Sequence, residues 1–214
     1  VMVTAPPFST MFLGWAVAWL CGLPLVLDFR DDWAGLYTHS YGIQKGGTAW
    51  KKAVIRSERF LTRAASLVIG NTPSLTQRLI SDHGAKASFT WIPNGYDAED
   101  FAGLEPHHPP ELPDGRLHIL YTGTVFEGSP LHHFWDGVAR LPQSLRERLW
   151  VEVVGRVVPG QTADPGLPGL EVKVRKYEPH AQVLSRMLGA DLLLLTLGSQ
   201  ADETRVVPAK LYEY

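Results

Sequence analysis

The sequence predicts an α/β protein built from two doubly wound parallel sheets. Short apolar runs alternate with helix-like segments in each half of the 214 residues, and this alternation is typical of parallel sheets covered by helices. The run LHILYTGTVF at residues 117–126 ends in a glycine-bearing turn that leads into a helix-like segment at 131–141. Such a pair is the first half of a βαβ unit, whose turn and helix N-terminus suit a nucleotide phosphate.

A proline-dense stretch at residues 102–115 separates the two series. Its composition is typical of a linker. We therefore predict a first domain over 1–104, a linker over 105–115 and a second domain over 116–214.

The first half begins with a long apolar run at residues 11–27, which Gly14, Gly22 and Pro24 interrupt. A membrane span needs about 20 apolar residues without such breaks, so a buried helix followed by a buried strand is predicted. Cys21 is interpreted as a buried free thiol, and Glu58 as an ordinary charge of a helix surface. The elements expected in this half are strands at 1–4, 25–29, 66–69 and 89–92 and helices at 10–21, 48–65 and 72–84.

The second half repeats the pattern after the strand at 117–121. A uniformly apolar segment at 191–197 is typical of a parallel strand that is covered on both faces. The other elements expected here are strands at 150–154 and 170–174 and helices at 131–141 and 180–188.

Composition and motifs exclude several function classes. The net charge is -2, with 20 basic and 22 acidic residues and no basic run, which argues against nucleic-acid binding. The sequence has no GxGxxG after a strand, no P-loop, no HExxH or CxxC and no GxSxG elbow. No metal or other cofactor is therefore expected.

Polar residues where strands end are the candidates that remain. Arg30 and Asp31 follow the strand at 25–29, and a surface ion pair or turn cap is the alternative reading. Lys210 and Glu213 are three residues apart on one side of a helix that Pro208 begins. Such a cation and anion could hold a phosphate and a ribose hydroxyl pair; a solvated helix face is the alternative.

Five segments together resemble retaining glycosyltransferases of family 4, which have the GT-B fold. In chain order they are VLDFRDDW, WIPNGYDAEDF, HILYTGTVF, HAQVLSRMLGADLLLLTL and VVPAKLYEY. The resemblance implies two Rossmann-like domains facing a cleft, with the acceptor mainly on the first and the nucleotide sugar mainly on the second. It also implies that both domains are incomplete here, so that the chain alone would lack transferase activity.

The resemblance also assigns roles to single residues. Arg30 stands where many relatives have a histidine near the sugar. Gly123 matches the glycine of the phosphate-facing turn. Many relatives have an arginine and a lysine just after this strand to hold the diphosphate, whereas this sequence has Thr124 and no nearby lysine. Glu213 matches the second acid of the family's ribose-holding glutamate pair, and Arg205 occupies the place of the first.

The predicted function is transfer of a hexose from a nucleotide sugar to a glycan, lipid-linked or small-molecule acceptor, with retention and in polysaccharide biosynthesis. Arg30 and Asp31 are the candidate catalytic residues. The candidate donor-binding residues are Thr122, Gly123, Thr124, Tyr177, Glu178, Lys210 and Glu213.

Two alternatives stay open at this point: a nucleotide-sugar 2-epimerase of the same fold, and a non-catalytic sugar- or nucleotide-binding protein. The predicted location is the cytoplasm, with peripheral association at the inner face of the membrane left open.

Overall fold

The computed structural model describes residues 1–38, 47–84, 87–127, 129–197 and 207–214. Arg205, to which the resemblance assigns a place in the acid pair, lies outside these residues. The chain forms two compact units, one of residues 1–95 with the described part of 199–213, and one of 96–198 with Tyr214. The linker and domain boundaries given above stay predictions.

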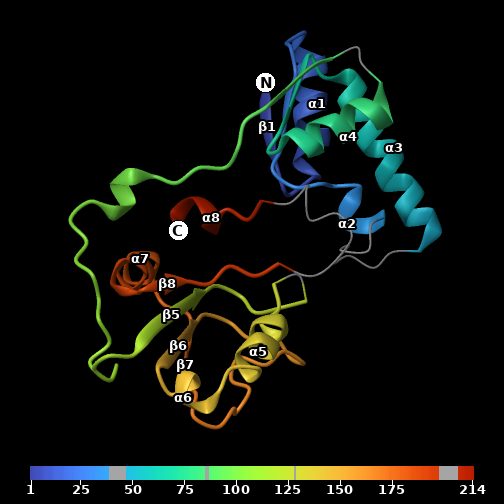
Figure 1. The fold of residues 1–214 in the computed structure, drawn as a ribbon. Coiled ribbons are helices and arrows are strands. Elements are labelled where there is room, and N and C mark those ends of the chain that lie inside the picture. The colour runs from blue at the N-terminus through green and yellow to red at the C-terminus, as the bar shows by residue number, and fades with distance from the viewer. Residues whose placement is uncertain (39–46, 85–86, 128, 198–206) are drawn as a thin grey trace. The chain divides into compact units, whose positions relative to one another are not determined.

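The first unit holds a sheet of four parallel strands in the order β1-β2-β3-β4. Its helices α1, α3 and α4 are labelled in Figure 1. Thr72 caps α4, because its side chain accepts a hydrogen bond from the Leu75 N–H at 3.1 Å, and Pro73 begins the first turn. The elements are β1 Met2–Ala5, α1 Thr10–Cys21, β2 Val26–Phe29, α2 Gly35–Thr38, α3 Thr48–Ala64, β3 Leu67–Gly70, α4 Pro73–His83, β4 Ser88–Trp91 and, later in the chain, α8 Lys210–Glu213.

The second unit holds another four-stranded parallel sheet, in the order β7-β6-β5-β8 (Figure 1). Leu120, Tyr121, Trp150 and Val151 of β5 and β6 are fully buried. The elements are η1 Ala98–Phe101, β5 Leu117–Thr122, α5 His132–Ala139, α6 Gln143–Arg146, β6 Leu149–Val154, β7 Glu171–Arg175, α7 His180–Gly189 and β8 Leu192–Leu193. Two parallel α/β sheets confirm the predicted fold class.

Three expectations from the sequence were wrong in detail. The strand expected at 191–197 is reduced to the two residues of β8, at the edge of the sheet with Leu192 half exposed. The helix expected to be buried, α1, has one exposed face, and Cys21, expected to be a buried thiol, is exposed with it. Glu58 is buried rather than on a helix surface. No helix in the described part of the chain is both long and apolar enough to cross a membrane.

Candidate functional site

Two glycines bring neighbouring turns into contact at the carboxyl edge of the second sheet. Gly123 follows β5 with φ 112°, and Gly155 follows β6 with φ 139°. A Cβ atom on Gly155 would lie 2.2 Å from the Gly123 carbonyl oxygen, so only glycine fits there. The Gly123 N–H donates to the Val154 carbonyl at 2.8 Å, and both Gly123 and Thr124 are exposed. This edge is where open α/β sheets bind ligands.

The residues on either side of Gly123 are held by side-chain hydrogen bonds. The buried Thr122 hydroxyl lies 3.0 Å from the hydroxyl of Tyr214. Tyr121 donates its hydroxyl to the Thr124 carbonyl at 3.0 Å, and burial raises the pKa of Tyr121. The turn therefore exposes the backbone of Gly123 and the side chain of Thr124, and the hydrogen bonds of Tyr121 and Thr122 hold the turn in place.

Arg156 is a cation beside this turn that the sequence analysis missed. Its carbonyl accepts a hydrogen bond from the Val125 N–H at 2.8 Å, which fixes Arg156 alongside the residues after Gly123. Its side chain is exposed, and no carboxylate of the described residues pairs with it. The available signal was its position one residue after Gly155, a strand-ending glycine like Gly123.

Tyr177 and Glu178 lie in the loop between β7 and α7, with different surroundings. Tyr177 is 82% exposed and open to a ligand. Glu178 accepts two hydrogen bonds from Arg186, at 2.6 and 3.1 Å. The Glu178 carboxylate is therefore engaged within the unit.

Arg186 also belongs to a buried charge network around Glu152 of β6. The Glu152 carboxylate is fully buried and lies 3.2 Å from His118 Nε2 and 3.1 Å from Arg186 Nη1, and it also accepts from Arg175 Nε. Burial alone would raise the pKa of Glu152, but the hydrogen bonds from His118 and Arg175 outweigh it and lower that pKa. This network joins three strands to α7 and so fixes the loop that carries Tyr177.

In the first unit, Arg30 binds groups of its own sheet. Its Nε donates to Asp28 Oδ2 at 2.9 Å, and its Nη1 donates to the carbonyls of Ile92 and Pro93 at 3.1 and 3.3 Å. The Asn71 side chain donates to the Arg30 carbonyl at 2.5 Å. Arg30 thus ties together the carboxyl ends of β2 and β4.

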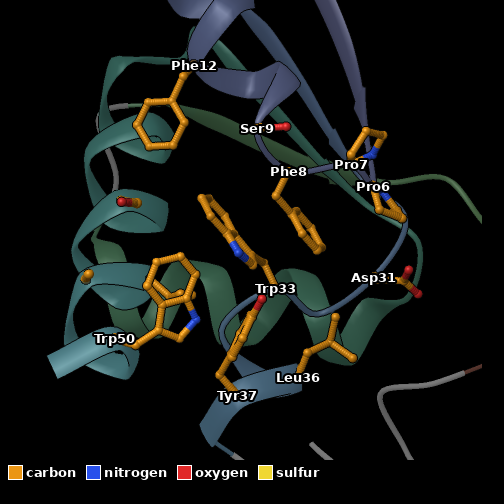
Figure 2. Close-up of a pocket in the computed structure, with 13 residues that line it drawn as sticks. Pro6, Pro7, Phe8, Ser9, Phe12, Asp31, Trp33, Leu36, Tyr37 and Trp50 are labelled. Carbon is orange, nitrogen blue, oxygen red and sulfur yellow. The ribbon is translucent and has the colours of Figure 1, made fainter. Parts of the chain in front are cut away.

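Asp31 lies at the edge of a pocket of about 540 Å³, which is lined by the segments that follow β1 and β2 and by α3 (Figure 2). Five aromatic residues are among those that line it. Phe8 stacks on Trp33 with centroids 4.9 Å apart, and Tyr37 meets Trp50 edge to face at 6.1 Å. Partial burial raises the pKa of Asp31, and the charge of Asp32 adds to this effect. An aromatic pocket with one carboxylate at its edge suits an acceptor that has both an apolar or ring face and a hydroxyl group.

Glu58 is a second feature that the sequence analysis misread. Its carboxylate accepts from Arg78 Nη1 and Nη2 at 2.8 and 3.2 Å, lies 2.6 Å from His83 Nε2 and accepts from the Ala34 N–H at 2.9 Å. Arg78 also reaches Asp32 Oδ1 at 2.8 Å. The cluster therefore holds the 31–35 segment, which supplies Asp31 and Trp33 to the pocket. A helix pattern alone could not place the partners, which come from α4 and from the loop after β2.

Lys210 and Glu213 lie on α8, within the first compact unit. Burial lowers the pKa of Lys210 to about 8, against the opposing charge of Glu213. Lys210 is therefore mostly protonated at neutral pH and close to losing its charge. Among the described residues, no group of His, Cys, Asp or Glu could hold a metal ion.

Comparison with known protein families finds a match for the first unit. The model of the glycosyl transferase 4-like domain family matches residues 1–95. Comparison with curated proteins gives no match.

Solved structures resemble nearly the whole chain. HepE of Anabaena, in complex with UDP-glucose, matches 92% of this chain and 53% of its own at 17% identity and a TM-score of 0.62. Sucrose-phosphate synthase of Thermosynechococcus elongatus matches 91% of this chain and 49% of its own, at 12% identity and a TM-score of 0.63. The chain spans about half the length of these proteins. Residues 1–95 therefore match a glycosyl transferase 4-like domain, and the chain as a whole has the GT-B type of α/β fold.

Proposed function

We propose that this protein transfers a hexose from a nucleoside diphosphate sugar to an acceptor hydroxyl with retention of the anomeric configuration. The observation that carries the proposal is the Gly123–Gly155 contact, which leaves an exposed backbone turn beside Arg156 at the carboxyl edge of the second sheet. HepE, which has a similar fold, binds UDP-glucose in its crystal structure.

The donor diphosphate would bind where backbone and side-chain charges favour it. The exposed Thr124 offers its backbone N–H and its hydroxyl, and Arg156 and Lys210 are the cations that we assign to the two phosphates. Such groups stabilise the charge that develops on the leaving diphosphate, which is the main requirement of the reaction. Glu213 would hold the ribose hydroxyls and Tyr177 would border the base, while Glu178 positions that loop through Arg186.

The acceptor, a glycan or a lipid-linked molecule, would occupy the aromatic pocket of the first unit. Asp31 is the residue that we assign to the acceptor hydroxyl, because its carboxylate lies at the pocket edge with a raised pKa. Arg30 acts as a positioning residue, since its guanidinium is bonded to Asp28 and to two carbonyls. Correct placement of the hydroxyl and the anomeric carbon supplies much of the rate enhancement.

A donor screen tests this function directly. The full reading frame that carries this chain is incubated with nucleoside diphosphate sugars, and release of the nucleoside diphosphate is followed with and without acceptors. The anomeric proton signals of donor and product give the stereochemistry. Retention supports the proposal, whereas inversion or interconversion of the sugar at C2 would contradict it.

Arg156→Ala is expected to raise the Kd for the donor nucleotide about tenfold, because a charge-assisted hydrogen bond contributes roughly 1.5–3 kcal/mol. Arg140→Ala is the matched control, since Arg140 is also exposed in the second unit but lies at the end of α5. Titration calorimetry with UDP compares the two variants. If Arg156→Ala and Arg140→Ala bind UDP with equal affinity, Arg156 does not belong to the donor site.

Lys210 is expected to make donor binding pH-dependent. Its pKa of about 8 in the folded protein means that it loses its proton, and with it the attraction for phosphate, as pH rises through that value. The donor KM should therefore increase between neutral pH and pH about 9. Lys210→Arg should flatten this increase, and Lys210→Met should lower kcat/KM about ten- to a hundredfold at neutral pH. A wild-type profile identical to that of Lys210→Met would contradict the assignment.

A further inference from the structure

We propose that Glu152 is a positioning residue for recognition of the donor's nucleobase, on which it acts through Arg186 and Glu178. These three side chains form one chain of contacts from the buried middle of β6 to the loop that carries Tyr177. The inference rests on the proposed function, because that function places the nucleobase beside Tyr177. It goes further by assigning the order of this loop to a single buried carboxylate.

Glu152 is a carboxylate in the middle of an otherwise apolar strand. It is fully buried, and so are Trp150 and Val154, which lie two residues before and after it in β6. Residues two apart in a strand point to the same face of the sheet, and Val154 packs there with Leu184 of α7. Glu152 therefore lies on the face that α7 covers.

A contribution to stability does not by itself account for a carboxylate at this position. Taking a charge out of water costs free energy, and a buried ion pair often stabilises a protein no more than apolar side chains of similar volume would. Hydrogen bonds between charged groups do, however, fix the orientation of both partners. The contacts of Glu152 therefore indicate which groups it orients.

Arg186 is the partner through which Glu152 reaches the loop. Its Nη1 donates to Glu152 Oε1 at 3.1 Å, while its Nε and Nη2 donate to the two carboxylate oxygens of Glu178 at 2.6 and 3.1 Å. The Arg186 side chain is only 11% exposed. Because a guanidinium group is planar and rigid, the contact with Glu152 sets the direction in which Arg186 presents its other nitrogens to Glu178.

Two further partners hold the Glu152 carboxylate itself in place. His118 Nε2 lies 3.2 Å from Glu152 Oε2, and Arg175 Nε donates to Oε1. These partners come from β5 and β7, the strands on either side of β6. The Arg175 carbonyl also accepts a hydrogen bond from the Gly155 N–H at 3.0 Å. Glu152 is therefore a fixed point from which Arg186 can align the loop.

Tyr177 depends on the backbone of its loop for its orientation. Within the described part of the chain its ring is 82% exposed, so neighbouring side chains restrain it little. Glu178 is the next residue, and its two hydrogen bonds with Arg186 fix the loop at that point. Loss of the Glu152 charge should therefore loosen the loop, and the Tyr177 ring would then meet the nucleobase less often in the right orientation.

Hydrogen exchange measures the order of the loop without any nucleotide. The full reading frame that carries this chain is used, and Glu152→Gln removes the charge while keeping the size of the side chain. We expect the backbone amides of residues 176–178 to exchange at least about tenfold faster in this variant, because charge-assisted hydrogen bonds are the strong ones. Glu111→Gln is the matched control and should leave the exchange rate within about twofold. Glu111 also accepts a hydrogen bond from Arg175 but lies further from the loop along the chain of contacts.

Titration calorimetry with UDP and with inorganic pyrophosphate distinguishes contacts to the base from contacts to the phosphates. Glu152→Gln should raise the Kd for UDP about tenfold, since stacking of one base on an aromatic ring is worth about that factor. The Kd for pyrophosphate should change by at most about twofold, because pyrophosphate has no base to contact Tyr177. In kinetics the donor KM should rise while kcat stays the same, as expected for a contact made equally in the ground and transition states.

Glu178→Gln acts at the outer end of the same chain of contacts. It should reproduce the faster exchange and the selective loss of UDP affinity, so the proposal stays testable if circular dichroism shows that Glu152→Gln does not fold. Unchanged exchange, or a loss of affinity no larger for UDP than for pyrophosphate, would overturn the positioning role and leave the proposed donor site in place. Failure of the wild type to bind UDP would contradict the proposed function and this inference together.

Discussion

Replacing Glu58 by glutamine is expected to lower the free energy of unfolding of the first unit by about 3 kcal/mol, as loss of one partner from a buried ion pair does. The carboxylate accepts hydrogen bonds from two nitrogens of Arg78 and from the Ala34 N–H, and it contacts His83. The amide cannot replace the charge. Of the anionic partners in the described part of the chain, the buried Arg78 guanidinium would then keep Asp32 and Asp82.

Urea unfolding followed by circular dichroism measures this loss. Arg59→Gln is the matched control, because the neighbouring side chain is exposed and its replacement should change stability by less than about 0.5 kcal/mol. A loss for Glu58→Gln of no more than about 1 kcal/mol, the value of an exposed ion pair, would show that the cluster is not a buried unit.

The stabilisation that the Glu58 cluster contributes depends on pH, and the direction of the Glu58 pKa shift predicts how. Burial would raise the pKa of Glu58, but hydrogen bonds from His83 and Arg78 outweigh it and place the pKa below the ordinary value of 4.5. The stabilisation is therefore complete above that value and is lost as pH falls through the lower pKa of the folded state. Wild-type protein should lose stability in acid more steeply than Glu58→Gln.

Gly155→Ala is expected to lower kcat/KM for the donor about a hundredfold. The added Cβ would lie 2.2 Å from the Gly123 carbonyl oxygen, so the phosphate-facing turn must move. A displacement of about 1 Å is enough for a hundredfold loss of rate in a preorganised site. The φ of 139° at Gly155 adds backbone strain to any side chain there.

Gly160→Ala is the control that distinguishes displacement of the Gly123 turn from backbone strain at a positive φ. Gly160 also has a positive φ, 85°, but a Cβ atom there would meet nothing within 4 Å. Steady-state kinetics of the two variants should show a large loss for Gly155→Ala and at most a small change for Gly160→Ala. Similar kinetics in both would show that the Gly123–Gly155 contact does not shape the donor site.

Local patterns predicted most of the fold. The bounds of α1 agree with the helix expected at 10–21, because Gly22 and Pro24 interrupt the apolar run after it. The helix expected at 72–84 likewise agrees with α4, which Thr72 caps and Pro73 begins. The prediction of a strand over 191–197 was wrong, because an apolar run does not reveal that its strand pairs with β5 over only two residues.

The candidate site was less accessible to sequence reasoning because its contacts are non-local. The sequence around Glu58 indicates a surface charge, because its partners Arg78 and His83 lie 20 and 25 residues away along the chain. Arg156 becomes a candidate only when the pairing of β5 and β6 sets it beside Val125. The roles of Arg30, Lys210 and Glu213 stay predictions.

Binding of UDP to the chain is the most direct test of the central claim, that the turn at Gly123 and Gly155 forms part of a nucleotide-sugar site. Titration calorimetry should show saturable binding at one site, weakened in Arg156→Ala and in Gly155→Ala but retained in Gly160→Ala. If neither UDP nor the diphosphates of the other nucleosides bind to the folded chain, or if Gly155→Ala binds as wild type does, the account is contradicted.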